Sequence, residues 1–267
     1  MLDGIILLWY VLTLLSLIYI TFDLIYTTPE ASVMKVGWWL VTLYAGPIAL
    51  FFYLLSCKEP MPGTHEQFIA PLWKQSLGSM VHCLAGDATG IIIAAFFLTF
   101  FSIGAAWEIF IEYLAGFAFG WFIFQSLFMK GMMGGTYGKA LTSSFIPEWF
   151  SMNMIMAGMI PVMAIWDVYQ PAARDTLTFY FWSKMSLATL VAGLCAFPIN
   201  RWLVKVKLKH GMMTIREGEM SMGEEHEHHQ NHGPMVTAKE ITFKGFLTLV
   251  GLAAGIVIAI LGTTFKI

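Results

Sequence analysis

The chain has 267 residues, of which 58 % are hydrophobic and 12 % are charged. Soluble domains carry roughly 25 % charged residues, so this composition excludes a water-soluble globular protein. The formal net charge of −2 excludes a global positive field of the kind that attracts nucleic acid. The expected partners are therefore the lipid bilayer and other membrane chains, in a homo-oligomer or a larger membrane complex.

Long apolar runs divide the chain into about seven segments. A helix needs about 20 residues to cross the roughly 30 Å hydrocarbon core of a bilayer. Lipid offers no partner for backbone polar groups, and these runs are too continuous for the alternating strands of a barrel. We therefore predict an all-α, polytopic transmembrane helix bundle with helices at about residues 4–26, 36–56, 78–101, 105–129, 147–168, 178–204 and 243–263.

Six of these helices form a predicted membrane bundle over residues 1–204, and the seventh lies within 243–267. Between them, residues 205–242 form a basic, Met-rich and His-rich loop whose polar composition predicts disorder. With seven crossings, eleven Lys and Arg residues share the side of this loop and four lie on the other side. The positive-inside rule then predicts a multi-pass protein of the cell membrane with a cytoplasmic N-terminus and an external C-terminus. This orientation depends on the number of crossings.

Small residues and one histidine recur at steps of four on one face of the third predicted helix, namely Gly78, His82, Gly86 and Gly90. Small residues allow close helix packing. Cys83 and Asp87 lie beside this face and are also four residues apart. An Asp at the centre of a membrane helix costs about 2.5 to 3.5 kcal/mol, so we expect a function for Asp87. The alternative is a structural Asp87 that is hydrogen-bonded to a neighbouring helix.

Two further acidic residues, Glu108 and Glu112, begin the fourth predicted helix. The turn before this helix is short, so the third and fourth helices are expected to be antiparallel neighbours. At about 1.5 Å per residue, Asp87 lies roughly 12 Å deeper in the membrane than Glu112. We therefore predict an ion pathway that leads from Glu108 and Glu112 to Asp87 and ends at His82 and Cys83. The alternative for Glu108 is a position at the membrane interface.

Methionines recur on one face of the fifth predicted helix, at Met152, Met156, Met159 and Met163. Thioether sulfur is a soft ligand that suits copper(I). Methionine also fills gaps in apolar cores, which is its more common use. The chain has 18 methionines, several of them outside the predicted helices. This abundance favours a metal-binding role for the stripe, with copper or another transition metal as the cofactor.

Four histidines are concentrated in the polar loop, at His226, His228, His229 and His232. Neutral imidazole is the commonest metal ligand, so we expect this tract to bind zinc, copper or nickel weakly. A solvated linker without a function is the alternative.

Several blocks of the sequence carry a family resemblance. They are the block from His82 to Asp87 (HCxxGD), the acidic helix from Glu108 to Tyr113, the Met-rich helix, and the block from Phe197 to Leu203 (FPxNxWL) before a basic tail. Together they resemble a prokaryotic family of multi-pass integral membrane proteins of unknown function. The matching blocks span roughly residues 68–213, and the first two helices and the His-rich loop lie outside them. The resemblance implies a helical membrane domain and supplies no activity.

We expect an integral membrane protein that binds or transports a metal cation, with copper favoured by the methionines. In this hypothesis the outer acidic residues attract the ion, and Asp87, His82 and Cys83 form the inner site. The alternative is a non-catalytic structural or assembly subunit that docks on a larger membrane complex through its glycine face. An enzyme is not favoured, because the sequence has no nucleophile motif, phosphate-binding glycine loop or complete zinc ligand set.

Overall fold

The computed structural model describes residues 2–101, 103–133, 136–215 and 236–265. This part of the chain is helical and contains no strand, although an isolated β-bridge joins Glu30 to Thr214. The helices are α1 (Leu2–Tyr26), α2 (Ser32–Ser56), α3 (His65–Ile69), α4 (Leu72–Leu98), α5 (Ala105–Ala118), η1 (Phe119–Gln125), α6 (Ser126–Met133), α7 (Tyr137–Tyr169), η2 (Pro171–Arg174), α8 (Phe179–Lys205) and α9 (Ala238–Phe265).

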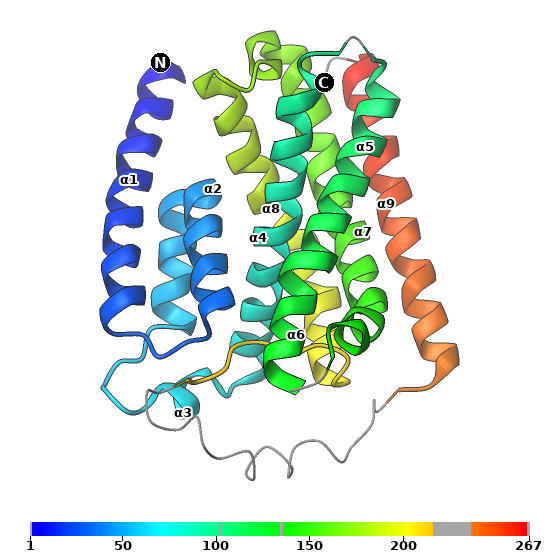
Figure 1. Ribbon diagram of the computed structural model, residues 1–267. Helices are drawn as coiled ribbons and strands as arrows, with labels where there is room; N and C mark the ends of the chain where they lie inside the picture. The colour runs from blue at the N-terminus through cyan, green and yellow to red at the C-terminus, as the bar shows by residue number, and fades with distance from the viewer. Residues whose placement is uncertain (1, 102, 134–135, 216–235, 266–267) are drawn as a thin grey trace.

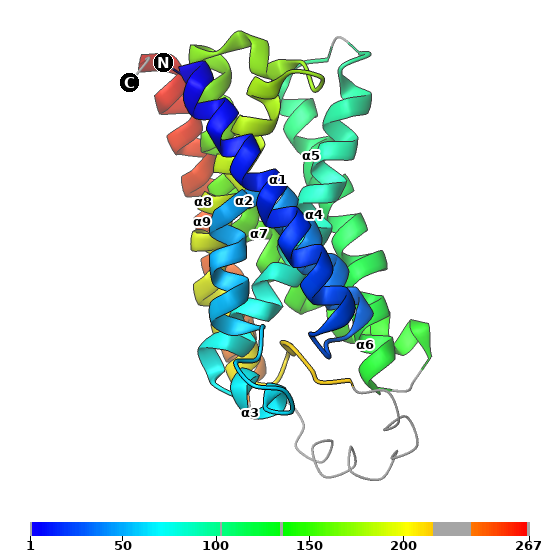
Figure 2. The same cartoon turned by 90° about the vertical axis from the view of Figure 1, so that its left-hand side faces the viewer.

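Within the described residues, seven helical runs are long and apolar enough to cross a membrane. They are α1, α2, α4, the continuous run Ala105–Lys130, α7, α8 and the run Ala238–Thr264 of α9. The predicted all-α membrane class is therefore confirmed. Figures 1 and 2 show the helices as one bundle, with α1 and α2 at one side of Figure 1 and α9 at the other.

The helix α7 lies against both α8 and α9, and small residues permit the close approach. A Cβ atom at Gly158 would lie 2.8 Å from the Cα atom of Ala192 in α8. A Cβ atom at Gly255 of α9 would lie 2.8 Å from the Cα atom of Ala157. Helix backbones that meet this closely gain van der Waals contact, which is the main packing force where lipid surrounds the helices.

The helix α2 is a hairpin of two half-helices. Gly46 has φ +56° and ψ −137°, which interrupts the helix, and Pro47 follows it. The ring centroids of Trp38 and Tyr53, one on each half, are 5.4 Å apart. Glu30 precedes α2 and Cys57 follows it, yet their ligand atoms lie within 4.8 Å of one another. A straight helix of 25 residues would separate its ends by about 37 Å, so α2 begins and ends at the same end of the bundle.

This hairpin determines at which end of the bundle the two ends of the chain lie. Because α2 turns back, the beginning of α1 and the end of α9 lie at the same end of the bundle, next to the N and C labels of Figure 1. The expectation that the two termini lie on opposite sides of the membrane assumed that the second helix crosses. The sequence contains the signal for the turn, since a glycine directly before a proline interrupts a helix readily.

Two further expectations differ from the structure. The fifth predicted helix was expected to open at Pro147, but α7 begins at Tyr137, where the Thr136 hydroxyl accepts a hydrogen bond from the backbone N–H of Lys139. The predicted disordered loop begins with a segment, residues 206–215, that packs into the bundle. Its Lys209 side chain is 1 % exposed. Lys209 has buried acceptors inside the bundle, which is why it does not stay at the membrane surface.

Candidate functional site

A cluster of polar side chains lies buried between α4, α7 and α8. We call it the central cluster, and its members are Cys83, Asp87, Glu148, Asn200 and Lys209. Each is at most 1 % exposed. Cys83 and Asp87 lie one turn apart on α4, Glu148 is on α7, Asn200 is on α8, and Lys209 reaches in from the segment after α8. Buried charges in a membrane interior are costly, so a cluster of this kind indicates a functional site.

Lys209 joins the members of this cluster. Its ammonium donates hydrogen bonds to Glu148 Oε2 at 3.4 Å, to Asn200 Oδ1 at 3.2 Å and to Cys83 Sγ. The Cys83 thiol also donates to Glu148 Oε2, at 3.1 Å. Burial alone would lower the pKa of Lys209, but the nearby Cys83 and Glu148 side chains outweigh this and raise its pKa above the ordinary value. The Lys209 side chain is therefore a buried cation held by three acceptors.

The carboxyl groups of Asp87 and Glu148 lie together against Gly120. A Cβ atom at Gly120 would overlap both Asp87 Oδ1 and Glu148 Oε1. Neither Asp87 oxygen, nor Glu148 Oε1, receives a hydrogen bond from another described donor. Two carboxylates offer only acceptors, so they bond to each other only when one of them holds a proton.

Gly120 lies in η1, a π-helical segment of seven residues. A π-helix is rare, and it often marks a functional site because it shifts side chains out of the regular helical register. Here the π-helix presents a glycine, without a side chain, to the two carboxyl groups. This leaves room for the pair between α4 and α7.

The amide of Asn200 connects the cluster to the surrounding hydroxyl groups. Its Nδ2 donates to Ser151 Oγ at 2.8 Å and to the backbone carbonyl of Ala196 at 3.0 Å. Its Oδ1 accepts from Ser79 Oγ at 3.3 Å as well as from Lys209. Because the amide is bonded at both ends, it fixes the position of the Lys209 ammonium.

The charges of the central cluster define its chemistry. Two carboxylates and one ammonium leave a single negative charge, which one proton or one monovalent cation would neutralise. An uncompensated charge in a buried site is strongly destabilising. The cluster therefore combines two carboxyl groups, one ammonium and the Cys83 thiol in one buried group.

The structure brings together two of the three predicted inner residues, Cys83 and Asp87. His82 lies on a different face of α4, and its ring packs against Phe124 and Phe128 with centroid separations of 5.6 and 4.8 Å. It is 2 % exposed but does not bond to the central cluster. His82 is five residues before Asp87, and side chains five residues apart point to different faces of a helix, which explains this separation.

The predicted outer residues lie apart from the central cluster. Glu112 is buried near Lys184 and Asp167, which form an ion pair at 2.7 Å. Glu108 is partly exposed, one turn before Glu112. A continuous ladder of carboxyl groups from Glu108 to Asp87 is therefore not formed by contacts among the described side chains.

The predicted methionine stripe lies in the core. Met152, Met156 and Met159 are 0 % exposed and Met163 is 9 % exposed. Glu148 is one turn before Met152, so the carboxylate and the thioethers share one face of α7. A Cβ atom at Gly116 would lie 2.8 Å from Met152 Cε and 3.0 Å from the backbone oxygen of Asp87, so the stripe begins beside the carboxyl pair. The loop histidines His226, His228, His229 and His232 lie outside the described residues.

The predicted glycine face is used for packing within the chain. A Cβ atom at Gly86 would lie 2.7 Å from Gly120 Cα, and one at Gly90 would lie 2.5 Å from the backbone oxygen of Ala115. Gly78 faces Met212 of the segment after α8. These contacts bring α5 and η1 against α4, and thereby place Gly120 on the carboxyl pair.

Sequence reasoning missed Glu148, Lys209 and Asn200 as site residues. Glu148 is a carboxylate next to Pro147 in an otherwise apolar helix, and an ionisable residue in such a helix indicates a functional site. Asn200 lies in the FPxNxWL block. Lys209 gave no signal, because it belongs to a run of basic residues typical of a membrane surface.

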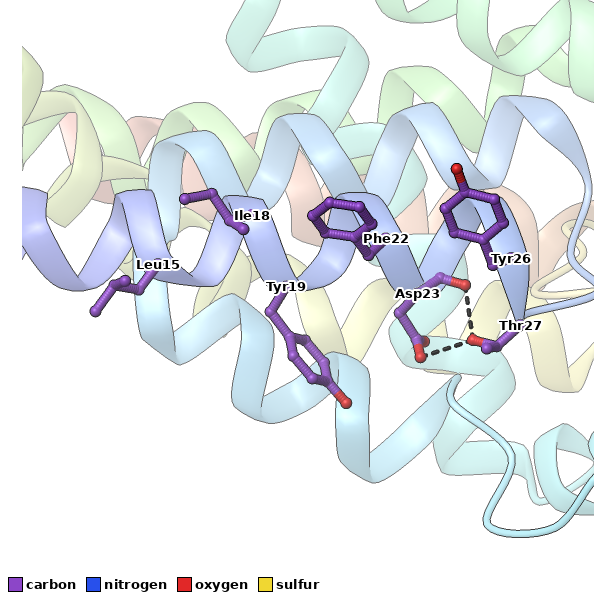
Figure 3. Close-up of a pocket in the computed structure, with 7 residues that line it drawn as sticks. All are labelled: Leu15, Ile18, Tyr19, Phe22, Asp23, Tyr26 and Thr27. Carbon is purple, nitrogen blue, oxygen red and sulfur yellow. Dashed lines mark hydrogen bonds between the residues drawn. The ribbon is translucent and has the colours of Figure 1, made fainter.

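A shallow apolar hollow follows the outer face of α1 (Figure 3), and its lining residues all come from α1 and the turn after it: Leu15, Ile18, Tyr19, Phe22, Asp23, Tyr26 and Thr27. Asp23 is engaged already, since it accepts hydrogen bonds from Thr27 at 2.7 Å and from Lys58 at 2.5 Å. The hollow thus offers a mainly apolar surface suited to lipid.

Comparison with known proteins places the chain in a family. A family model described as a domain of unknown function, DUF4396, matches residues 72–209. No curated protein and no solved structure matches the chain. The matched region covers more than half of the chain and contains every member of the central cluster, whereas α1, α2 and α3 precede it. The chain therefore belongs to the DUF4396 family, whose function is unknown.

Proposed function

We propose that this membrane protein binds a metal cation, copper(I), at the central cluster and releases the proton shared by Asp87 and Glu148 in exchange. The observation that carries the proposal is the buried pair of carboxyl groups with a single ammonium, that of Lys209, as counter-charge. One cation enters and one proton leaves, so the charge of the buried site stays constant.

The donors around the pair favour a soft cation. The Cys83 thiol lies 3.1 Å from Glu148 Oε2. The thioethers of Met152, Met156 and Met159 follow Glu148 on the same buried face of α7. Thiolate and thioether sulfur select copper(I) over sodium, magnesium or calcium, which prefer oxygen. The methionine face also offers a route for the cation along α7 after it leaves the carboxyl pair.

The same proposal includes an orientation in the cell membrane. Among the described residues, every Lys and Arg except Arg174 and Lys184 belongs to the end of the bundle that holds α3 and residues 206–215. The positive-inside rule assigns this end to the cytoplasm. Both termini would then be external, so the C-terminal prediction is kept and the cytoplasmic N-terminus is replaced.

Transport by the purified full-length chain in proteoliposomes tests the proposal. We expect copper(I) uptake accompanied by a change in internal pH, and we expect Glu148→Gln and Asp87→Asn to abolish both signals. The matched control for the two carboxylate variants is Glu108→Gln, because Glu108 lies outside the central cluster.

Three results would contradict the proposal. Equal copper content and flux in the native chain and in Glu148→Gln would remove the cluster from the pathway. A pH signal with sodium but none with copper(I) would keep the exchange and reject copper. If the native chain neither binds nor moves a cation, the remaining hypothesis is a structural subunit of a membrane complex.

A further inference from the structure

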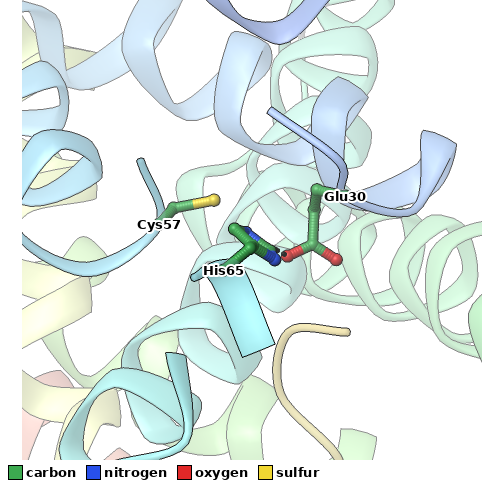
Figure 4. A group of neighbouring side chains, drawn as sticks. All are labelled: Glu30, Cys57 and His65. Carbon is green, nitrogen blue, oxygen red and sulfur yellow. Dashed lines mark ion pairs between the residues drawn. The ribbon is translucent and has the colours of Figure 1, made fainter. Parts of the chain in front are cut away.

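A second buried cluster lies outside the region matched by the family model. Glu30 lies in the turn between α1 and α2, Cys57 directly follows α2, and His65 begins α3. One ligand atom from each residue lies within 4.8 Å of the other two. Figure 4 shows the three side chains pointing toward one another from these separate segments. Their exposures are 4 % for Glu30 and 0 % for Cys57 and His65, so the surrounding chain encloses the group.

Outer contacts orient two of the three donors. Glu30 Oε1 accepts hydrogen bonds from the backbone N–H groups of Ala31 at 3.0 Å and Met213 at 2.9 Å. This turns Glu30 Oε2 toward His65 Nε2, 4.0 Å away. His65 Nδ1 lies 2.8 Å from Thr214 Oγ1. In the tautomer in which His65 Nδ1 donates to Thr214, the lone pair of Nε2 faces Glu30 and Cys57. Metal-binding histidines are oriented in the same way, by a hydrogen bond from the other ring nitrogen.

We propose that Glu30 Oε2, Cys57 Sγ and His65 Nε2 bind one zinc ion, at a site separate from the central cluster. Sulfur, imidazole nitrogen and carboxylate oxygen are the three donor types of zinc sites. Zinc bonds of about 2.0 to 2.3 Å place ligand atoms roughly 3.3 to 3.8 Å apart, so small side-chain rotations close the site around the ion. A fourth ligand, such as water, would complete the tetrahedron.

The charge balance favours a divalent ion. A carboxylate, a thiolate and a neutral imidazole carry two negative charges, which a zinc ion cancels, so the buried site becomes neutral. Without a cation, burial raises the pKa of Glu30 to about 8 and also raises the pKa of Cys57. Zinc would therefore release protons from these groups as it binds.

The site would join parts of the chain that are distant in sequence. It connects the end of α1, both ends of the α2 hairpin and α3. Through Met213 and Thr214 it also reaches the segment that carries Lys209. A metal ion at such a junction stabilises the folded arrangement by the binding free energy it gains only there.

Metal binding by the full-length chain in detergent tests the inference. The His-rich loop would also bind zinc, so His226, His228, His229 and His232 are first replaced by alanine in every sample. After chelator treatment and zinc loading, we expect one tightly held zinc ion per chain. Cys57→Ser and His65→Ala should weaken binding by about tenfold or more. Cys195→Ser is the matched control, since Cys195 lies in α8, is partly exposed and does not belong to the group.

Cobalt(II) substitution gives a readout that does not depend on a stable variant. The chain with native Cys57 should show thiolate-to-cobalt charge-transfer absorption with tetrahedral character. Absence of that absorption would overturn the proposal even if Cys57→Ser fails to fold, and so would equal zinc content in the parent and Cys57→Ser. Asp87→Asn should keep the zinc while losing copper exchange, which separates this inference from the proposed function.

Discussion

The rings of Trp38 and Tyr53 pack edge to face with centroids 5.4 Å apart, although both residues belong to the segment Ser32–Ser56. A continuous helix would separate residues at these positions by about 22 Å. The contact therefore requires the chain to reverse between them, at Gly46 and Pro47. Because of this reversal, α2 returns to the end of the bundle at which it began and does not pass from one end of the bundle to the other.

The first prediction is that both termini lie on the same side of the membrane. Epitope tags at the two ends should both be accessible in cells without permeabilisation. A membrane-impermeant maleimide should label Leu177→Cys in intact cells, because Leu177 is 83 % exposed at the end of the bundle that holds the termini. Lys205→Cys should react only after permeabilisation. Labelling is measured in a Cys195→Ser background, and tags on opposite sides would contradict the hairpin.

The second prediction concerns the apex of the hairpin. Gly46→Ala should destabilise the protein, because a residue with a Cβ atom at φ +56° and ψ −137° costs about 1 to 3 kcal/mol of backbone strain. The new Cβ atom would also lie 2.5 Å from Thr13 Oγ1 of α1. Thermal unfolding in detergent measures the change. Gly4→Ala is the control, since nothing lies within 4 Å of a Cβ atom there, and equal melting temperatures for the two variants would argue against a strained apex.

The sequence identifies the helices well, because each long apolar run has to be helical in lipid. It fails where the backbone departs from regular helix. The run containing Gly46 is apolar throughout, so hydropathy alone does not distinguish a hairpin from a crossing. Direction and topology then depend on one backbone conformation that composition does not reveal.

The sequence predicts only the members of the central cluster that lie on one helix. The four-residue spacing of Cys83 and Asp87 places both on one side of α4, and the structure agrees. Their partners come from distant parts of the chain, and Lys209 lies 126 residues after Cys83. Spacing within a helix can reveal neighbours along that helix, but it cannot reveal which other segment supplies the opposite charge.

The third prediction tests the buried ion pair. Lys209→Met removes the ammonium that lies 3.4 Å from Glu148 Oε2 and leaves the carboxyl pair without a counter-charge. Breaking a buried pair in this way costs about 3 to 5 kcal/mol. The double variant Lys209→Met with Glu148→Gln should recover much of this loss, because it removes the unpaired charge as well.

A double-mutant cycle on thermal stability measures the coupling between Lys209 and Glu148. The exposed Lys205→Met serves as the control and should change stability little. Additive effects of the two substitutions would mean that the ammonium and the carboxylate do not interact in the folded protein.

The fourth prediction distinguishes packing inside the chain from docking on another subunit. Gly86→Leu would drive a side chain into Gly120 Cα and Phe124, and Gly90→Leu would drive one into the backbone of α5. Overpacking costs typically about 1 to 3 kcal/mol, so both variants should unfold at lower temperature as isolated chains. Gly138→Ala, which meets nothing within 4 Å, should not. A different result would favour the assembly-subunit hypothesis. In that case Gly86→Leu would keep its melting temperature but elute with a smaller mass than the native protein, because the glycine face would mediate association between chains and not packing within one chain.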